Sequence, residues 1–373
     1  MGKRGIGLIS NLLGVVTYHT NIHINGVHSD LMGVAIFFVI SGFIMVYITR
    51  ETDEDFLLKR LIRIVPIYWV LTIAALLWFG LGFANPPYTW PLWASSIAHP
   101  IHLARWFAAQ ALSMATPATA MALLRSLTFW PTAQDPMPIL PVGWTLNIEM
   151  FFYVLFAIAL LAGRAAAPFI SGAVLVVLFR MEASGSYHSQ VLATWGHAYV
   201  ICFVFGMAIF YLWSAIEPVV RSHRVIAITV ASAMLLNWPV SIFVYEQNWT
   251  TLYVVSPSVV LALLILHSAG LRVRAQFLID LGGASYSLYL IHVPILETRR
   301  ASASAFPFLT LSTPAGCAIA TTLSCAAALI CYHKLEVPLL RLIRLHVSRR
   351  RSQHASAAVA AAAASTQDFV SPV

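Results

Sequence analysis

Residues 31–69 read LMGVAIFFVISGFIMVYITRETDEDFLLKRLIRIVPIYW, and this stretch decides the fold. Its first part, residues 31–49, carries no charge and approaches the roughly 20 residues that a helix needs to cross a bilayer. A short charged segment follows, and a second apolar run then opens on Arg60 and Arg63. Because Lys and Arg collect on the cytoplasmic side of membrane helices, the pattern predicts two transmembrane helices joined by a cytoplasmic loop.

The composition of the whole chain agrees with a membrane protein. Of 373 residues, 60% are hydrophobic and 10% are charged, and the mean hydropathy is +0.81. Soluble domains carry about 25% charged residues. The net charge of +8 comes from short loops and the C-terminus, so it indicates membrane topology and not nucleic-acid binding. The four cysteines lie in apolar runs without CxxC spacing, which is typical of packing residues.

Ten apolar runs predict an all-α, polytopic membrane helix bundle. They lie at residues 5–20, 31–49, 62–83, 142–162, 166–181, 196–213, 225–243, 251–269, 277–297 and 307–331. The segment 103–128 is left out because it contains Arg105, Pro117 and Arg125. With ten spans, 17 of the 22 Lys and Arg residues fall on the cytoplasmic side, against 10 if 103–128 is an additional span. We therefore predict ten transmembrane helices with both termini cytoplasmic.

This topology sets the expected domain organisation. Residues 1–345 should form one transmembrane domain, in which residues 84–141 are an extracytoplasmic segment that lies partly in the interface, where Trp and Tyr are favoured. Residues 346–373 are basic and then Ala/Ser-rich, so we expect a disordered cytoplasmic tail whose arginines contact anionic lipid. The first run has no small-residue cleavage site, so no cleavable signal peptide is expected.

Ionisable residues near or inside the spans are the first functional candidates. A charged side chain at a helix centre costs about 2.5–3.5 kcal/mol on insertion scales, so its presence points to function. His19 lies at the outer end of the first run, and an imidazole there can exchange a proton near neutral pH. A solvated histidine at a helix end is the simpler interpretation. With His23, His28 and Asp30 nearby a metal site is conceivable, but no HExxH-like context supports it and we predict none.

Two other spans carry polar side chains. Glu149 lies about a turn and a half inside its run, either as a functional carboxylate or as a hydrogen-bonding partner of a neighbouring helix. A later run carries a polar stripe that could equally serve helix packing, formed by Ser285, Tyr286, Ser287, Tyr289 and His292. Tyr289 and His292 are three residues apart and share a helix face.

A basic cluster opens the third run. Arg60, Arg63 and Tyr68 could be plain topological charge, or the arginine forks could bind phosphates such as those of coenzyme A. In the ten-span topology these arginines lie at the inner face, whereas Glu149 and His292 fall in the outer half together with His19. This arrangement predicts a pore-like site, with a phosphate-binding mouth on the cytoplasmic side and ionisable side chains on the extracytoplasmic side.

Four ordered strings resemble the membrane acyltransferase 3 family, and are most like its exopolysaccharide-production acetyltransferases. They are FFVISGF, RIVPIYW, WTLNIEMFFY and GGASYSLYLIH, which begin at Phe37, Arg63, Trp144 and Gly282. Upstream of them, His19 in VVTYH matches the essential histidine of the family. The family also has an arginine before that histidine, and here Leu8 occupies its place.

The resemblance implies an O-acyltransferase in the bacterial inner membrane. It would move an acetyl or similar short acyl group from cytoplasmic acetyl-CoA, a co-substrate, to a sugar hydroxyl of an exported or lipid-linked polysaccharide. No permanently bound cofactor is expected. The implied partners are the lipid bilayer, the acyl-CoA, the polysaccharide acceptor and possible polysaccharide-assembly machinery.

The resemblance also assigns residue roles. His19 would be the base that takes the hydroxyl proton, or a transient acyl carrier, and Glu149 would orient an imidazole or the sugar. Tyr286 or Tyr289 would donate to the developing oxyanion, and His292 completes the catalytic set. The residues expected to bind substrate or acyl-CoA are Arg60, Arg63, Tyr68, Trp69, Trp144 and Ser285.

Two other functions stay open at this point. A proton-coupled transporter or flippase for a lipid-linked sugar could use His19, Glu149 and His292 as a proton relay. Discontinuous helices in paired halves of the chain would favour transport. The unmatched arginine position leaves an inactive assembly partner as a third interpretation.

Overall fold

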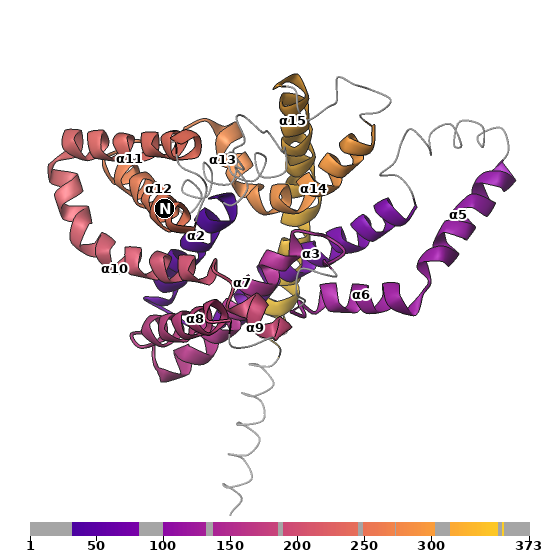
Figure 1. Ribbon diagram of the computed structural model, residues 1–373, viewed down its shortest axis with the longest axis horizontal. Coiled ribbons are helices and arrows are strands. Elements are labelled where there is room, and N and C mark those ends of the chain that lie inside the picture. The colour runs from indigo at the N-terminus through magenta and orange to yellow at the C-terminus, as the bar shows by residue number, and fades with distance from the viewer. Residues whose placement is uncertain are drawn as a thin grey trace, which may run out of the picture.

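The computed structural model describes residues 32–81, 100–131, 137–185, 189–244, 249–272, 274–302, 314–349 and 353. All regular elements in these ranges are helices (Figure 1). The helices are α2 (Met32–Thr49), α3 (Phe56–Gly80), α5 (Pro100–Met114), α6 (Pro117–Leu127), α7 (Gly143–Ala159), α8 (Ala167–Ala183), α9 (Gln190–Trp195), α10 (Val200–Ser222), α11 (Arg224–Val244), α12 (Trp249–Ser268), α13 (Gln276–Gly283), α14 (Ser285–Ser302) and α15 (Pro314–Cys331). A 3₁₀ turn, Leu160–Ala162, follows α7, and a π-helical turn, Tyr332–Glu336, follows α15.

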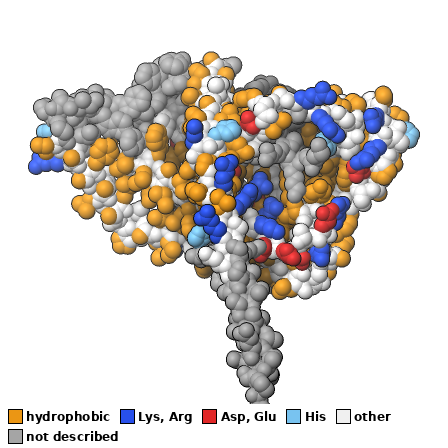
Figure 2. All heavy atoms as spheres, turned by 180° about the vertical axis from the view of Figure 1, so that it is seen from behind, with side chains coloured by type: hydrophobic (Ala, Val, Ile, Leu, Met, Phe, Trp, Pro, Cys, Tyr) orange, Lys and Arg blue, Asp and Glu red, His pale blue; other side chains and the backbone are white. Residues whose placement is uncertain are grey.

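The prediction of an all-helical membrane protein is confirmed. Nine of the ten predicted apolar runs coincide with described helices, and the run 5–20 lies outside the described residues. Among the described residues, four helices are long and apolar enough to cross a membrane, or five if one bent pair is a single span. The number of ten spans and the cytoplasmic termini stay predictions. Hydrophobic side chains are spread widely over the face seen in Figure 2, as a lipid-covered surface requires.

The segment 103–128 forms two helices, α5 and α6, that are bent by 71° relative to each other. The bend follows from the sequence ATP at residues 115–117. The Thr116 hydroxyl accepts a hydrogen bond from the Thr119 N–H at 3.1 Å, and Pro117 occupies the first turn of α6. Together the pair is apolar enough to be a broken span or a re-entrant loop. In Figure 1, α5 extends away from the other helices.

A contact between two loops constrains the topology. Arg164, in the turn between α7 and α8, donates to the Glu51 carbonyl oxygen at 2.5 Å and lies 3.6 Å from the Asp53 carboxylate. The α2–α3 and α7–α8 loops therefore lie at the same end of the bundle. An even number of crossings must separate them, which α3 and α7 supply without a complete crossing by α5 and α6.

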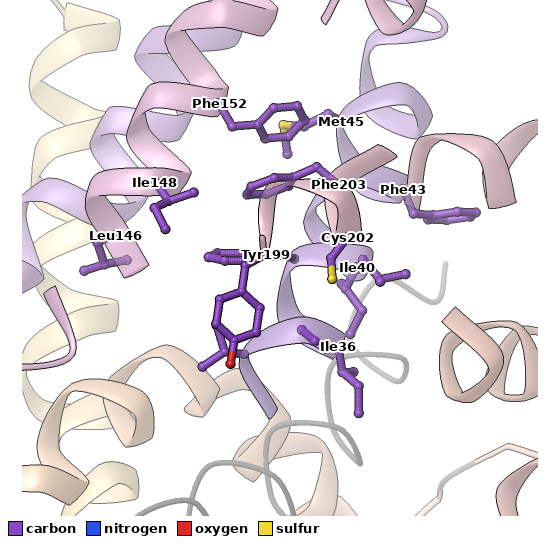
Figure 3. Close-up of a cluster of buried hydrophobic side chains, with 14 of the residues drawn as sticks. Ile36, Ile40, Phe43, Met45, Leu146, Ile148, Phe152, Tyr199, Cys202 and Phe203 are labelled. Atoms are coloured by element: carbon purple, nitrogen blue, oxygen red, sulfur yellow. The ribbon is translucent and has the colours of Figure 1, made fainter. Parts of the chain in front are cut away.

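The aromatic core lies where α2, α7 and α10 meet (Figure 3). Phe203 of α10 is the centre, with its ring 4.6 Å from Phe38 and 4.1 Å from Phe152. All three side chains are fully buried. Helices in lipid are held together mainly by close packing and hydrogen bonds, so this interlocked layer fixes α2 and α7 against α10.

Two glycines let α2 and α10 cross with their backbones in contact. A methyl group added at Gly42 would overlap the carbonyl oxygen of Phe203, and one added at Gly206 would overlap that of Val39. Each glycine therefore faces the backbone of the opposite helix. Small residues at such crossings are typical of membrane helices.

Gly42→Ala and Gly206→Ala should each destabilise the protein by about 1–3 kcal/mol, the usual cost of overpacking. Gly172→Ala in α8 is the matched control, because its new methyl group would lie at an ordinary 3.6 Å from the Met207 side chain. The measurement is the thermal unfolding midpoint of each purified variant in detergent. Equal midpoints for Gly42→Ala and Gly172→Ala would contradict the backbone contact.

Candidate active site

Glu149 is the most deeply buried carboxylate of the described chain, with 2% of its surface exposed. It lies on α7 and its Oε1 accepts hydrogen bonds from the Tyr153 hydroxyl, one turn along, and from Ser41 of α2 at 3.4 Å. Its Oε2 is buried and has no hydrogen-bond partner among the described residues. Buried polar atoms are nearly always hydrogen-bonded in folded proteins, so this oxygen is available to a group outside the described residues or to a substrate.

Two arginines of α3 face this carboxylate. Arg60 and Arg63 both interact electrostatically with Glu149, and Arg60 also with Tyr153. Among the described ion pairs, neither arginine has a carboxylate within 4.0 Å. The Arg60 Nε is buried and likewise lacks a partner in the described part of the chain. Opposite charges thus lie near each other without closing on each other, which leaves their hydrogen-bonding capacity for a ligand.

Helix α14 contributes Tyr286, which is buried beside the same groups. Its hydroxyl donates to the Ile64 carbonyl oxygen of α3 at 3.0 Å. It also interacts electrostatically with Glu149 and Tyr153. We call the set that these contacts bring together the Glu149 cluster, formed by Ser41, Arg60, Arg63, Glu149, Tyr153 and Tyr286.

The rest of the predicted polar stripe lies elsewhere. Tyr289 donates to the Val142 carbonyl oxygen at 3.1 Å and contacts the Thr145 hydroxyl, at the start of α7. His292 is fully buried; its Nδ1 lies 3.1 Å from the Leu288 carbonyl oxygen and its ring 6.0 Å from that of Tyr289. The stripe therefore serves two places, with Tyr286 in the Glu149 cluster and Tyr289 at the first turn of α7.

The predicted binding residues beyond the arginines are dispersed. The Tyr68 ring packs 4.9 Å from Phe129, and the Trp69 indole donates to the Leu127 carbonyl oxygen at 2.8 Å, so both attach α3 to the end of α6. Trp144 packs against His197 and Tyr199, at 5.6 and 5.8 Å between rings. Ser285 lies half-buried at the first residue of α14. Trp69 and Trp144 make these contacts outside the Glu149 cluster, whereas Tyr68 interacts electrostatically with Tyr286, a member of the cluster.

The catalytic candidate His19 lies outside the described residues, as do His23, His28 and Asp30. Its predicted role stays a prediction. In the described ranges, no group of three His, Cys, Asp or Glu side chains could hold a metal ion.

Three residues of this neighbourhood, Ser41, Tyr153 and Glu336, were not among the predicted site residues. Ser41 and Tyr153 lie in the strings FFVISGF and WTLNIEMFFY, but no role was predicted for either, although both contact Glu149. Glu336, a weak further match to the family, was likewise given no role, although it is a buried acid in an apolar C-terminal helix, which is a signal for function. Glu149 was predicted to lie apart from Arg60 and Arg63, whereas the structure places all three in one cluster.

An all-helical membrane protein with a buried acid, two arginines and tyrosines between its helices has the interior of a membrane enzyme or a transporter. The comparison with known sequences decides the class: the chain belongs to the acyltransferase 3 family, whose profile, described as an acyltransferase domain, matches residues 11–333. The exopolysaccharide production protein ExoZ of Rhizobium meliloti (strain 1021) is 30% identical over 346 residues, which cover 89% of this chain and 94% of ExoZ. No solved structure matches the chain.

Proposed function

We propose that this protein is an inner-membrane O-acyltransferase that acts in exopolysaccharide production. It transfers an acetyl or similar short acyl group from cytoplasmic acyl-CoA to a sugar hydroxyl of an exported or lipid-linked polysaccharide. The family membership supports acyl transfer, and the name of the relative, an exopolysaccharide production protein, supports a polysaccharide acceptor. The acyl-CoA is consumed as a co-substrate, and no bound cofactor is required.

The observation that carries the chemistry is the unpartnered Oε2 of the buried Glu149. A sugar hydroxyl is a poor nucleophile, and a base that takes its proton typically contributes 10²–10⁴-fold to the rate. In this proposal His19 is that base, and the free oxygen of Glu149 accepts the hydrogen bond that orients the imidazole or the hydroxyl.

The proposed transfer needs only the hydroxyl, the thioester and His19 to account for every bond and proton. The hydroxyl oxygen attacks the thioester carbonyl carbon while its proton passes to His19. The carbon–sulfur bond breaks, and the proton passes on to the thiolate of coenzyme A as it leaves. Tyr286 interacts electrostatically with Glu149, and in this proposal its hydroxyl turns from the Ile64 carbonyl oxygen to donate to the oxyanion that develops on the thioester carbonyl oxygen.

The arginines supply the donor site. Guanidinium forks bind phosphate oxygens in pairs, and coenzyme A carries a pyrophosphate and a 3′-phosphate. Arg63 is exposed and Arg60 half-buried, so the pair leads from the surface to the buried carboxylate. The acyl group would enter along this line.

The test of the function is mass spectrometry of the surface polysaccharide from host cells with and without the gene. The repeating unit should be lighter by one acyl group per modified sugar in cells that lack the protein, and the gene in trans should restore the mass. A loss of exported polysaccharide with unchanged acyl content would instead indicate the transporter. That result would overturn the acyltransferase proposal.

A further inference from the structure

The C-terminal helix contains a feature that the proposed reaction does not use. Residues Tyr332–Glu336 form a π-helical turn between α15 and the helical stretch that continues to Arg349. Such turns are rare and frequently mark functional sites, because the extra residue changes the direction of the side chains that follow. Here the turn leaves His333 and Lys334 exposed and buries Glu336 to 5% exposure.

The buried Glu336 is held by α14. The Ser287 hydroxyl donates to its Oε2 at 2.5 Å. The turn itself is fitted against α13, because a methyl group on Gly283 would lie 2.7 Å from the Tyr332 hydroxyl. The carboxylate therefore has a fixed place in the bundle.

That place is beside Arg63. Glu336 interacts electrostatically with Arg63, which also faces Glu149. The contact from Tyr286, the neighbour of Ser287, to the carbonyl oxygen of Ile64 joins α14 to α3 at the residue after Arg63. Arg63 thus interacts with two buried carboxylates that belong to two different helical segments.

We propose that Glu336 is a positioning residue that holds the Arg63 guanidinium toward the acyl donor and away from Glu149. An arginine side chain has many rotamers, and one that faces a single buried carboxylate closes on it as an ion pair. Such a pair would occupy both the donor-binding fork and the free oxygen of Glu149. A second carboxylate on another helix competes for the same guanidinium and keeps both groups available. This inference rests on the proposed function.

The experiment uses the purified full-length protein and separate titrations of acetyl-CoA and acceptor. Glu336→Gln should raise KM for acetyl-CoA about tenfold, the size of one charge-assisted hydrogen bond, and leave KM for the acceptor unchanged. Glu336→Asp should restore part of the loss. The control is Glu217→Gln, which removes a carboxylate that pairs with Arg221 at 2.6 Å on the surface of α10.

The double variant separates positioning from packing. If Glu336 acts through Arg63, adding Glu336→Gln to Arg63→Ala should raise KM for acetyl-CoA no further. Additive effects, or a fall in kcat with KM unchanged, would show that Glu336 serves helix packing only. If Glu336→Gln fails to fold, Ser287→Ala must raise the same KM to a smaller extent. An unchanged KM in folded Ser287→Ala would then overturn the inference.

Arg63→Ala distinguishes this inference from the proposed function on which it rests. Normal acetyl-CoA affinity in Arg63→Ala would overturn the donor role of Arg63 and the positioning role with it. Weakened affinity in Arg63→Ala with normal affinity in Glu336→Gln would overturn the positioning role alone.

Discussion

His19→Ala should abolish acyl transfer while expression and folding are retained. We expect a fall of at least about 10²–10⁴-fold, since no other group in the proposed reaction takes the hydroxyl proton. The measurement is transfer of labelled acetyl from acetyl-CoA to polysaccharide by the purified protein. Because only the neutral imidazole accepts a proton, the wild-type rate should also fall as the pH drops through the pKa of that imidazole.

His23→Ala is the matched control for this prediction. The two histidines are four residues apart, so a general disturbance of this segment should affect both variants alike. We expect His23→Ala to keep most of the activity. An active His19→Ala protein beside an inactive His23→Ala protein would move the base to His23 and invalidate the matched string VVTYH.

Glu149→Gln should reduce the rate by about 10²-fold or more, which is the lower end of what positioned acid–base groups contribute. The amide keeps the size of the side chain and can still accept from Tyr153, but it removes the negative charge that Arg60 and Arg63 face. The measurement is kcat at saturating acetyl-CoA, with the thermal unfolding midpoint as a check on folding.

Tyr153→Phe separates the contribution of the Tyr153 hydrogen bond from that of the Glu149 charge. It removes the hydrogen bond to Oε1 and leaves the carboxylate charge and the unpartnered Oε2 in place. We expect a loss of less than about tenfold, as one ordinary hydrogen bond contributes. A loss equal to that of Glu149→Gln would mean that orientation by Tyr153, and not the free oxygen, is what the reaction requires.

The helices could be predicted from the sequence because their signal is local. Long apolar runs such as 62–83 and 142–162 correspond directly to α3 and α7. The structure of segment 103–128 was harder to predict. Its arginines make it a poor candidate for a transmembrane helix, and the Thr116 cap and Pro117 divide it into two helices. Hydropathy alone gives no bend angle, so the direction of α6 relative to α5 came only from the structure.

The site was predictable residue by residue but not as an assembly. Arg60, Arg63, Glu149 and Tyr286 were each recognised as unusual in their helices. The sequence could not show that these side chains lie in one cluster, because their proximity depends on how α3, α7 and α14 cross. The bond from Ser287 to Glu336 was further hidden by the π-helical turn, since a regular helical period places that side chain on a different face.

The crossing of α2 and α10 at Gly42 and Gly206 also has a consequence for motion. Helices whose backbones touch cannot slide along or rotate about each other without a clash, so α2 and α10 should move as one rigid body. Helix α14 is joined to α3 through the hydroxyl of Tyr286 and, nearer the end of α3, through the Trp78 indole, which donates to the Thr298 hydroxyl at 2.8 Å. Rotamer changes of these side chains can break and remake both links. We therefore expect substrates to gain access by displacement of α14 from α3, with the α2–α10 pair as the stationary wall.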